Sequence, residues 1–160
     1  MNIFVLDTCP KLAAIYQPDK MLVKMVLETA QLLSTARRFI DGDEGNEHLY
    51  KSTHINHPCS KWVRESLENY KWLLNHFFYL ANEYRNRFNK QHKSYSKLFK
   101  TLAFLPLKNT PNDERTPFAQ AMPEQYRDPS DAVKAYRNYV IAEKSYAKWE
   151  NGREKPDWWK

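Results

Sequence analysis

The stretch PCSKWVRESLENYKWLLNHFFYLANEYRNRF (residues 58–88) decides the fold that this sequence predicts. Apolar side chains recur along it at alternating spacings of four and three residues, at Val63, Leu67, Tyr70, Leu74, Phe77, Ala81, Tyr84 and Phe88. This spacing places them on one stripe of an α-helix, which has to be buried against other elements. Because proline suits the first turn of a helix, we expect one continuous helix that begins at Pro58 and forms the centre of the fold.

Two further helices are expected on either side of this central helix. The first runs from Pro18 and Asp19 to about Ile40, since it repeats apolar residues at helical spacing and opens with a proline and an acidic side chain. A polar, glycine-containing loop follows at residues 41–47. Residues 93–105 predict a shorter helix with lysines along one face.

The last third of the chain predicts a long loop and a final helix. Residues 106–129 contain five prolines and show no periodicity, which is typical of a loop. The final helix is expected from an N-cap at Ser130 to about Trp149. No internal repeat is visible, so we expect residues 1–160 to form a single domain, an all-α bundle around the central helix.

Composition narrows the class of protein. The chain has only three glycines and many aromatic residues, which predicts an ordered, helical protein. Its formal net charge of +6 favours polyanionic partners but does not define the fold. Two cysteines form no disulfide framework, and the sequence has neither a signal peptide pattern nor an apolar run long enough for a bilayer. We expect an intracellular, soluble protein without membrane contact.

Glu28 is the first candidate functional residue. It lies in the apolar segment KMVLETAQLL (residues 24–33), and helical spacing places Lys20, Lys24 and Gln31 on its face. The spacing alone favours a solvated face with pairs four residues apart. The functional alternative is a carboxylate held close to a lysine for acid–base or electrostatic work.

The segment THINHPC (residues 53–59) holds a second group of candidates. His54, His57 and Cys59 are all metal-ligand types, but their spacing matches no familiar zinc motif, so we expect no metal. A histidine directly before a helix N-terminus is better suited to donate a hydrogen bond to a polar or anionic ligand. The alternative is a loop whose side chains only cap the helix.

Basic residues alternate with aromatic residues in the C-terminal half. Lysines and arginines bind phosphates and aromatic rings stack on exposed bases, so several such faces together indicate nucleic-acid binding. The alternative, which any single residue would favour, is a solvated lysine surface with half-buried tyrosines. The residues concerned are Lys93, Lys97, Lys100, Lys134, Arg137, Lys144 and Lys148, with Tyr136, Tyr139, Tyr146 and Trp149 between them. Trp158 and Trp159 lie close to the chain end, where they either dock on the core or meet a ligand.

Taken in order, these segments resemble the pyrimidine-dimer DNA glycosylase/AP lyase family, which includes the phage endonuclease V type and bacterial relatives. Three blocks carry the resemblance, and together they cover about half of the chain. They are MNIFVLD with DKMLVKMVLETAQLL, then NHPCSKWVRESLENYKWLL, and finally AYRNYVIAEK with REKPDWW.

The resemblance implies a mechanism and roles for particular residues. Such enzymes act on double-stranded DNA without a cofactor: they expel a nucleotide and attack the sugar C1′ with the chain's own α-amino group, forming an imine that undergoes β-elimination. The amine would belong to Met1, and Glu28 would stabilise the cationic sugar. His57, with Asn56 beside it, would lie near the expelled nucleotide. The expected substrate-binding and DNA-binding residues are Lys20, Lys24, Gln31, His54, Asn56, Lys61, Arg64, Arg137, Lys144, Trp158 and Trp159.

The chain departs from this family pattern at two places. Asn2 follows the initiator methionine where the phage enzymes have a small residue, which favours retention of Met1 as the amine bearer; Asn2 is therefore counted with the catalytic set. Leu27 and Gln31 replace the arginines that flank the glutamate in the phage enzymes. Lys20 or Lys24 could supply a substitute amine if a second cation lowered the pKa of the lysine.

The sequence thus predicts a monomeric DNA glycosylase with AP-lyase activity on a damaged or modified pyrimidine. Two alternatives remain open. One is an enzyme on the same scaffold that acts on a hypermodified base rather than on damage. The other is a DNA-binding or protein-binding module that keeps the fold without catalysis.

Overall fold

The computed structural model describes residues 1–106 and 108–160; Leu107, inside the predicted proline-rich loop, lies outside the described residues. In this part of the chain the regular structure is helical apart from one isolated β-bridge, which confirms the all-α prediction. The elements are α1 (Pro10–Ile15), α2 (Asp19–Asp41), α3 (Pro58–Glu65), α4 (Leu67–Phe88), α5 (Lys93–Ala103), the short 3₁₀ helix η1 (Glu124–Tyr126) and α6 (Ala132–Glu143). No helix in the described ranges is both long and apolar enough to cross a bilayer.

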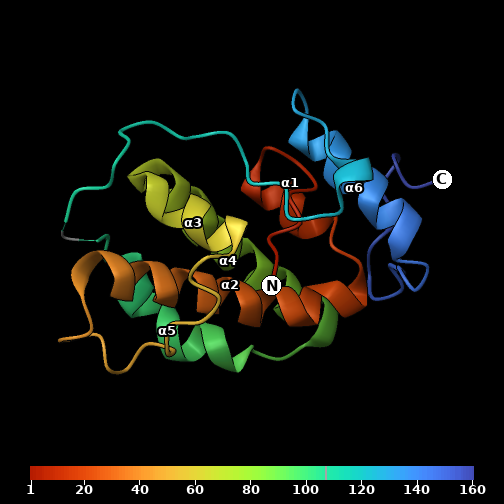
Figure 1. Cartoon of the computed structure of the whole chain (residues 1–160). Helices are drawn as coiled ribbons and strands as arrows, with labels where there is room; N and C mark the ends of the chain where they lie inside the picture. The colour runs from red at the N-terminus through yellow and green to blue at the C-terminus, as the bar shows by residue number, and fades with distance from the viewer. Residues whose placement is uncertain (107) are drawn as a thin grey trace.

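Helix α4 is the centre of the arrangement, as the apolar stripe predicts. Helices α1, α2, α3 and α5 all pack against it, and α2 also packs against α3 and α5. Figure 1 shows α2 lying along α4, with α6 and the C-terminus on the right of the view. The teal segment after residue 107 passes over α3 on its way to α6 (Figure 1). All six α-helices contribute to a hydrophobic core cluster.

The predicted continuous central helix is wrong at Ser66, where the chain breaks into α3 and α4. Ser66 adopts an extended conformation (φ −149°, ψ 154°), and its hydroxyl accepts a hydrogen bond from the Asn69 N–H at 3.0 Å. The carbonyl of Glu65, freed by the break, accepts the Asn112 N–H at 3.0 Å. A serine hydroxyl readily accepts a backbone N–H at the start of a helix. Residues of the loop 108–116 bond to backbone groups that would have had helical partners without the break.

The predicted final helix is wrong at both ends. Its N-cap is Asp131, not Ser130, because the Asp131 carboxylate accepts a backbone N–H three residues further on. The helix ends at Glu143, well before Trp149. The chain then turns back so that the Trp149 indole N–H donates to the Tyr16 carbonyl at 3.1 Å. Docking of this segment on α1 and α2 therefore replaces the last turns of the expected helix.

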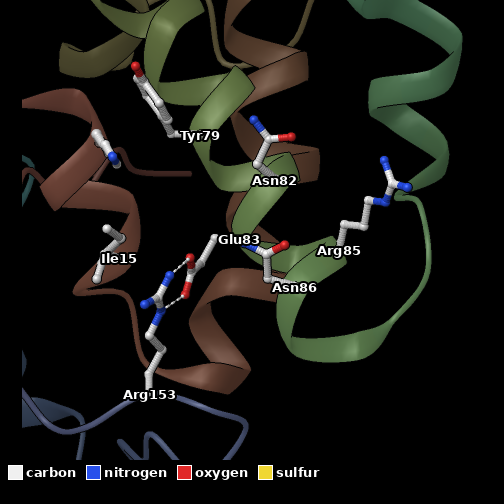
Figure 2. Close-up of a pocket in the computed structure, with 8 residues that line it drawn as sticks. Ile15, Tyr79, Asn82, Glu83, Arg85, Asn86 and Arg153 are labelled. Atoms are coloured by element: carbon white, nitrogen blue, oxygen red, sulfur yellow. Dashed lines mark hydrogen bonds and ion pairs between the residues drawn. The ribbon is translucent and has the colours of Figure 1, made fainter.

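A buried ionic network fastens this C-terminal tail. Arg153 donates to both carboxylate oxygens of Glu83 on α4, at 2.6 and 2.8 Å (Figure 2). The same carboxylate accepts from Arg87 at 2.8 Å, and Arg87 also donates to Asp19 at 2.9 Å. A polar groove of about 500 Å³ lies over Glu83 and Arg153, between α1, α4 and the tail. The network therefore joins α1, the start of α2, α4 and the tail into one body.

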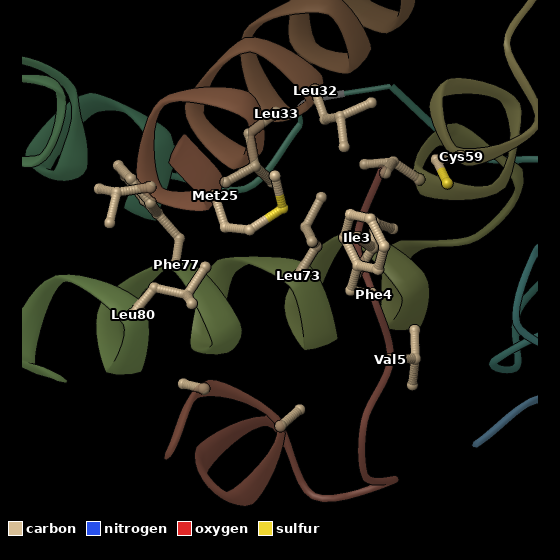
Figure 3. Close-up of a cluster of buried hydrophobic side chains, with 14 of the residues drawn as sticks. Ile3, Phe4, Val5, Met25, Leu32, Leu33, Cys59, Leu73, Phe77 and Leu80 are labelled. Atoms are coloured by element: carbon tan, nitrogen blue, oxygen red, sulfur yellow. The ribbon is translucent and has the colours of Figure 1, made fainter. Parts of the chain in front are cut away.

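The N-terminal segment before α1 is extended and buried. Ile3, Val5 and Leu6 are at most 2% exposed. Figure 3 shows this segment beside Cys59 of α3 and Leu73 of α4, with its side chains within the core. Phe4 has a left-handed backbone (φ 51°), which a bulky residue adopts only when its surroundings impose it. The first residues are thus part of the core rather than a free end.

Candidate active site

Glu28 is buried beside the start of the chain. Glu28 lies in the third turn of α2 and is only 7% exposed. The interpretation of Glu28 as part of a solvated face is therefore wrong. Oxygen Oε2 accepts the backbone N–H of Asn2 at 2.8 Å and lies 3.9 Å from the α-amino nitrogen of Met1. Oxygen Oε1 lies 3.4 Å from Nζ of Lys24, the ion pair that the helical spacing predicts. The fold therefore brings the amine of Met1 to a carboxylate 27 positions further along the chain.

An open cavity of about 290 Å³ lies at this point. Of the predicted site residues it is lined by Met1, Asn2, Lys20, Lys24, Glu28 and Lys144. Phe4, Met21, Met25, Ala121, Tyr139 and Tyr146 complete the lining. One carboxylate thus faces three lysines and the N-terminal amine, so the cavity is suited to an anionic ligand.

Aromatic rings support two of these lysines. Lys144, which directly follows α6, places its ammonium 4.9 Å from the ring centroid of Tyr139. The Tyr139 ring is parallel to that of Phe4 within 2°, at 6.1 Å between centroids. Lys20 lies 5.7 Å from the ring of Tyr146. Flat rings and cations around one opening are the features by which proteins hold nucleotides.

Sequence reasoning did not place Phe4, Tyr139 or Tyr146 in the site. Tyr139 and Tyr146 belong to the basic and aromatic pattern near the C-terminus, so the pattern indicated their chemistry but not their neighbours. Phe4 gave no signal at all, because one aromatic residue in an apolar run is indistinguishable from a core residue.

His57 lies at the N-cap of α3, where its Nδ1 accepts the Cys59 N–H at 3.2 Å. This hydrogen bond leaves the Nε2 side of the ring as the donor in the neutral imidazole. Burial lowers the pKa of His57, the positive N-terminal amine and His54 lower it further, and Glu28 opposes them. His57 is therefore electrostatically coupled to the amine and to Glu28, although it does not line the cavity itself.

The other candidate residues near His57 and Glu28 do not line the cavity. His54 and Asn56 are exposed, and the Nδ1 atom of His54 is 2.6 Å from the Thr53 hydroxyl. Gln31 is half-buried on α2, one turn beyond Glu28.

Cys59 is buried, and burial raises the pKa of its thiol to about 11, which keeps the thiol protonated. Among the described residues no group of three His, Cys, Asp or Glu side chains could hold a metal ion.

Lys61 and Arg64 line a different cavity, of about 470 Å³, between α2, α3 and residues 108–111. The guanidinium of Arg64 lies 4.1 Å from the ring of Phe39, which is 60% exposed, and donates to the Ile55 carbonyl at 2.7 Å. The structure therefore separates these two cations from the cavity at Glu28, so any contact they make with DNA is at a second place on the surface.

Arg137, Trp158 and Trp159 make contacts within the chain. Arg137 donates to the Leu6 carbonyl at 2.9 Å and pairs with Asp7 at 3.2 Å. The two tryptophans are half-buried and pack with Trp149 against the core. Of the two possibilities that the sequence left open for the tail, docking on the core is the one observed.

Taken together, the all-α scaffold carries an amine, a buried carboxylate, lysines and aromatic rings around one cavity, a combination typical of small helical proteins that act on nucleic acid. Residues 1–96 match the family model described as pyrimidine dimer DNA glycosylase. This match spans more than half of the 160 residues, and the chain belongs to that family. No match was found among curated proteins or among solved structures.

The match settles the resemblance for the first two sequence blocks. It ends before the third block, AYRNYVIAEK with REKPDWW, whose likeness to the family stays a prediction. At the level of the family the chain is a pyrimidine dimer DNA glycosylase, and DNA is its substrate.

Proposed function

We propose that this protein excises a damaged or modified pyrimidine from double-stranded DNA and then cleaves the strand as an AP lyase. One observation carries the proposal: the first two backbone nitrogens of the chain lie 3.9 and 2.8 Å from the buried Glu28 carboxylate, at an open cavity. An amine next to a carboxylate in a partly enclosed site is the arrangement that imine chemistry requires.

The α-amino group of Met1 is the proposed nucleophile. Its deprotonated nitrogen carries the electron pair that attacks the sugar. That pair forms a bond to the sugar C1′ while the glycosidic bond breaks; the base leaves with the bonding electrons and takes up a proton. Opening of the sugar ring then gives an imine between the amine and C1′.

β-Elimination completes the lyase step. Loss of a proton from C2′ is followed by cleavage of the bond between C3′ and its phosphate oxygen, so the strand breaks with the phosphate as leaving group. Water then hydrolyses the imine and returns the amine. Glu28, with its oxygens beside the amine and Lys24, is placed to stabilise the developing positive charge and to carry protons between these steps.

His57 and the cations have supporting roles in this proposal. Burial lowers the pKa of His57, which favours the neutral imidazole, and its Nε2–H is the group proposed to donate a hydrogen bond to the expelled nucleotide. Lys20 and Lys144 rest on aromatic rings, and a ring leaves the ammonium N–H groups free for phosphate oxygens. Expelling the nucleotide costs a few kcal/mol, and less where damage already weakens stacking.

Borohydride trapping tests the mechanism. Wild-type protein incubated with duplex containing an AP site or a pyrimidine dimer should give a covalent adduct on reduction, and peptide mapping should locate it on residue 1. Glu28→Gln should lose most of the adduct while binding the duplex. Glu68→Gln, which removes a half-exposed ion pair with Lys71 away from the cavity, is the matched control. Absence of any adduct with the wild-type protein on both substrates refutes the imine mechanism.

Peptide mapping also separates the alternative amines. An adduct on Lys20 or Lys24 would make a lysine the nucleophile, which the sequence left open. Intact-mass measurement shows whether Met1 is retained. Its removal would leave the amine on Asn2, whose nitrogen already lies 2.8 Å from Glu28.

A panel of duplex substrates with different bases identifies the base that the protein removes. Leu27 is 38% exposed and Gln31 half-buried where the resemblance leads one to expect arginines, so the panel includes hypermodified pyrimidines besides dimers. Activity only on a modified base would identify the first alternative function. Duplex binding without any cleavage, unaffected by Glu28→Gln, would identify the non-catalytic module.

A further inference from the structure

Both polar atoms of the Asn2 side chain form hydrogen bonds inside the protein. Its Oδ1 accepts the backbone N–H groups of Ile3 at 2.7 Å and Phe4 at 3.2 Å, and the Cys59 thiol lies 3.8 Å away. Its Nδ2 donates to the Ala121 carbonyl at 2.7 Å. The two bonds to Oδ1 turn residues 2–4 around the side-chain amide of Asn2. The bond from Nδ2 connects this amide to Ala121, in the loop that follows residue 108.

Tyr136 of α6 holds the loop residues that receive Asn2. Its hydroxyl donates to the Ala119 carbonyl at 2.8 Å and accepts the Ala121 N–H at 3.2 Å. The ring is fully buried, so the hydroxyl is fixed in place. A chain of short contacts thus runs from Tyr136 through residues 119–121 to Asn2, and from the Asn2 N–H to Glu28.

We propose that Tyr136 and Asn2 are positioning residues that hold the N-terminal amine at the Glu28 carboxylate. The inference rests on the proposed function, whose nucleophile is that amine. The device is built partly outside the family match, because Tyr136 and Ala121 follow residue 96. It acts through other residues and does not touch the reacting atoms.

The need for such a device follows from the geometry of Met1. The Met1 nitrogen is 3.9 Å from Glu28, too far for a hydrogen bond, so this contact alone does not fix the amine. The left-handed backbone of Phe4 also works against the observed path of the segment. The hydrogen bonds that the Ile3 and Phe4 N–H groups donate to Asn2 Oδ1 compensate for this strain. Attack at C1′ depends steeply on placement, and a misplacement of about 1 Å can cost on the order of 100-fold in rate.

Tyr136→Phe is the direct test, with Tyr70→Phe as its matched control. Both tyrosines are fully buried, but the Tyr70 hydroxyl donates to the Leu102 carbonyl, at 2.9 Å, away from the cavity. At saturating duplex, Tyr136→Phe should slow borohydride-trapped adduct formation by about 10-fold to 100-fold without weakening duplex binding. Tyr70→Phe should leave the trapping rate at the wild-type value although it loses comparable stability.

A second measurement needs neither DNA nor catalysis. The rate at which formaldehyde and a borohydride methylate the α-amine, followed by peptide mass spectrometry across pH, reports how firmly the amine is held. Tyr136→Phe and Asn2→Gln should both methylate faster than wild type, and Tyr70→Phe should not. Asn2→Gln keeps a large residue after Met1, and intact mass verifies that the N-terminus is unchanged.

The outcomes separate the two proposals. Faster methylation in Tyr136→Phe and Asn2→Gln supports the positioning device even if no adduct forms, in which case only the proposed function fails. A wild-type adduct whose rate Tyr136→Phe leaves unchanged overturns the device and spares the function. Methylation equal to wild type in both variants overturns the device regardless of activity.

Discussion

Replacing Arg87 by methionine should destabilise the fold through the buried network at the tail. The Arg87 side chain is 1% exposed and donates to the Glu83 and Asp19 carboxylates at 2.8 and 2.9 Å. It also donates to the carbonyls of Ile15 and Gln17 at 2.7 and 2.8 Å. Methionine matches the length of the stem but removes all of these donors, so two carboxylates and two carbonyls lose a partner inside the protein.

The structure sets the size of the loss. Removing one member of a buried ion pair costs roughly 3–5 kcal/mol, because the other charge stays buried without its partner. Glu83 keeps both bonds from Arg153, and Asp19 keeps bonds from Glu150 N–H and Asn151. We therefore expect the lower end, about 3 kcal/mol, which lowers Tm by roughly 6–12 °C for a chain of this size.

Urea unfolding followed by circular dichroism measures the difference, with Arg85→Met as the control. Arg85 lies on the same helix but is exposed and points away from Glu83 (Figure 2), so its replacement should change stability by no more than about 0.5 kcal/mol. A loss below about 1 kcal/mol for Arg87→Met, or equal losses for the two variants, would refute the reasoning.

Because of the same network, the stability difference between wild type and Arg87→Met should depend on pH. Burial alone would raise the pKa of the Glu83 carboxyl, but hydrogen bonds from Arg153 and Arg87 hold the pKa below its ordinary value. The pKa of Asp19 is lowered too, against burial, by bonds from Glu150, Asn151 and Arg87. Carboxyls with lowered pKa stabilise the fold above their unfolded pKa and lose this contribution as pH falls through the folded one. The gap between wild type and Arg87→Met should therefore narrow in acid.

Three further predictions concern a helix cap, a buried histidine and two lysines. Ser66→Ala removes the side-chain acceptor of the Asn69 N–H, so urea unfolding should show a loss of about 1 kcal/mol; no loss would argue against the cap. Burial lowers the pKa of fully buried His76 to about 4, so the unfolded chain binds its proton first and stability should fall as pH drops from 6.5 toward 4. His76→Gln should flatten that slope in unfolding titrations, and an unchanged slope would contradict the assignment. Lys20→Ala and Lys144→Ala should each reduce the salt dependence of duplex binding, measured by fluorescence anisotropy, by about one phosphate contact, or a slope change of roughly 0.9; a slope equal to wild type in both would exclude phosphate contacts there.

Local patterns were a sound guide to the helices and a poor guide to where they end. The apolar stripe of α4 and the proline–aspartate start of α2 depend on neighbours within a few residues, so the sequence alone reveals them. The break at Ser66 and the early end at Glu143 depend on partners far along the chain. For Ser66 these partners lie in the loop 108–116, and for the end of α6 they are Tyr16 and Asp19.

The candidate site divides in the same way. Glu28 and Lys24 are one helical turn apart, so their pairing follows from spacing alone. The separation of Lys61 and Arg64 from the cavity could not be predicted, because both follow His57 closely in sequence but lie on a face of α3 turned toward Phe39.

By itself, the sequence determined an all-α protein with a central amphipathic helix, an excess of positive charge and a glutamate unusual among its neighbours. Only the tertiary structure decided that this glutamate is buried beside the first residues of the chain and that Tyr136 and Asn2 hold them there. The physical reason is range. Helical periodicity is a property of residues three and four apart, whereas an amine 27 positions from its carboxylate meets it only after the core has packed.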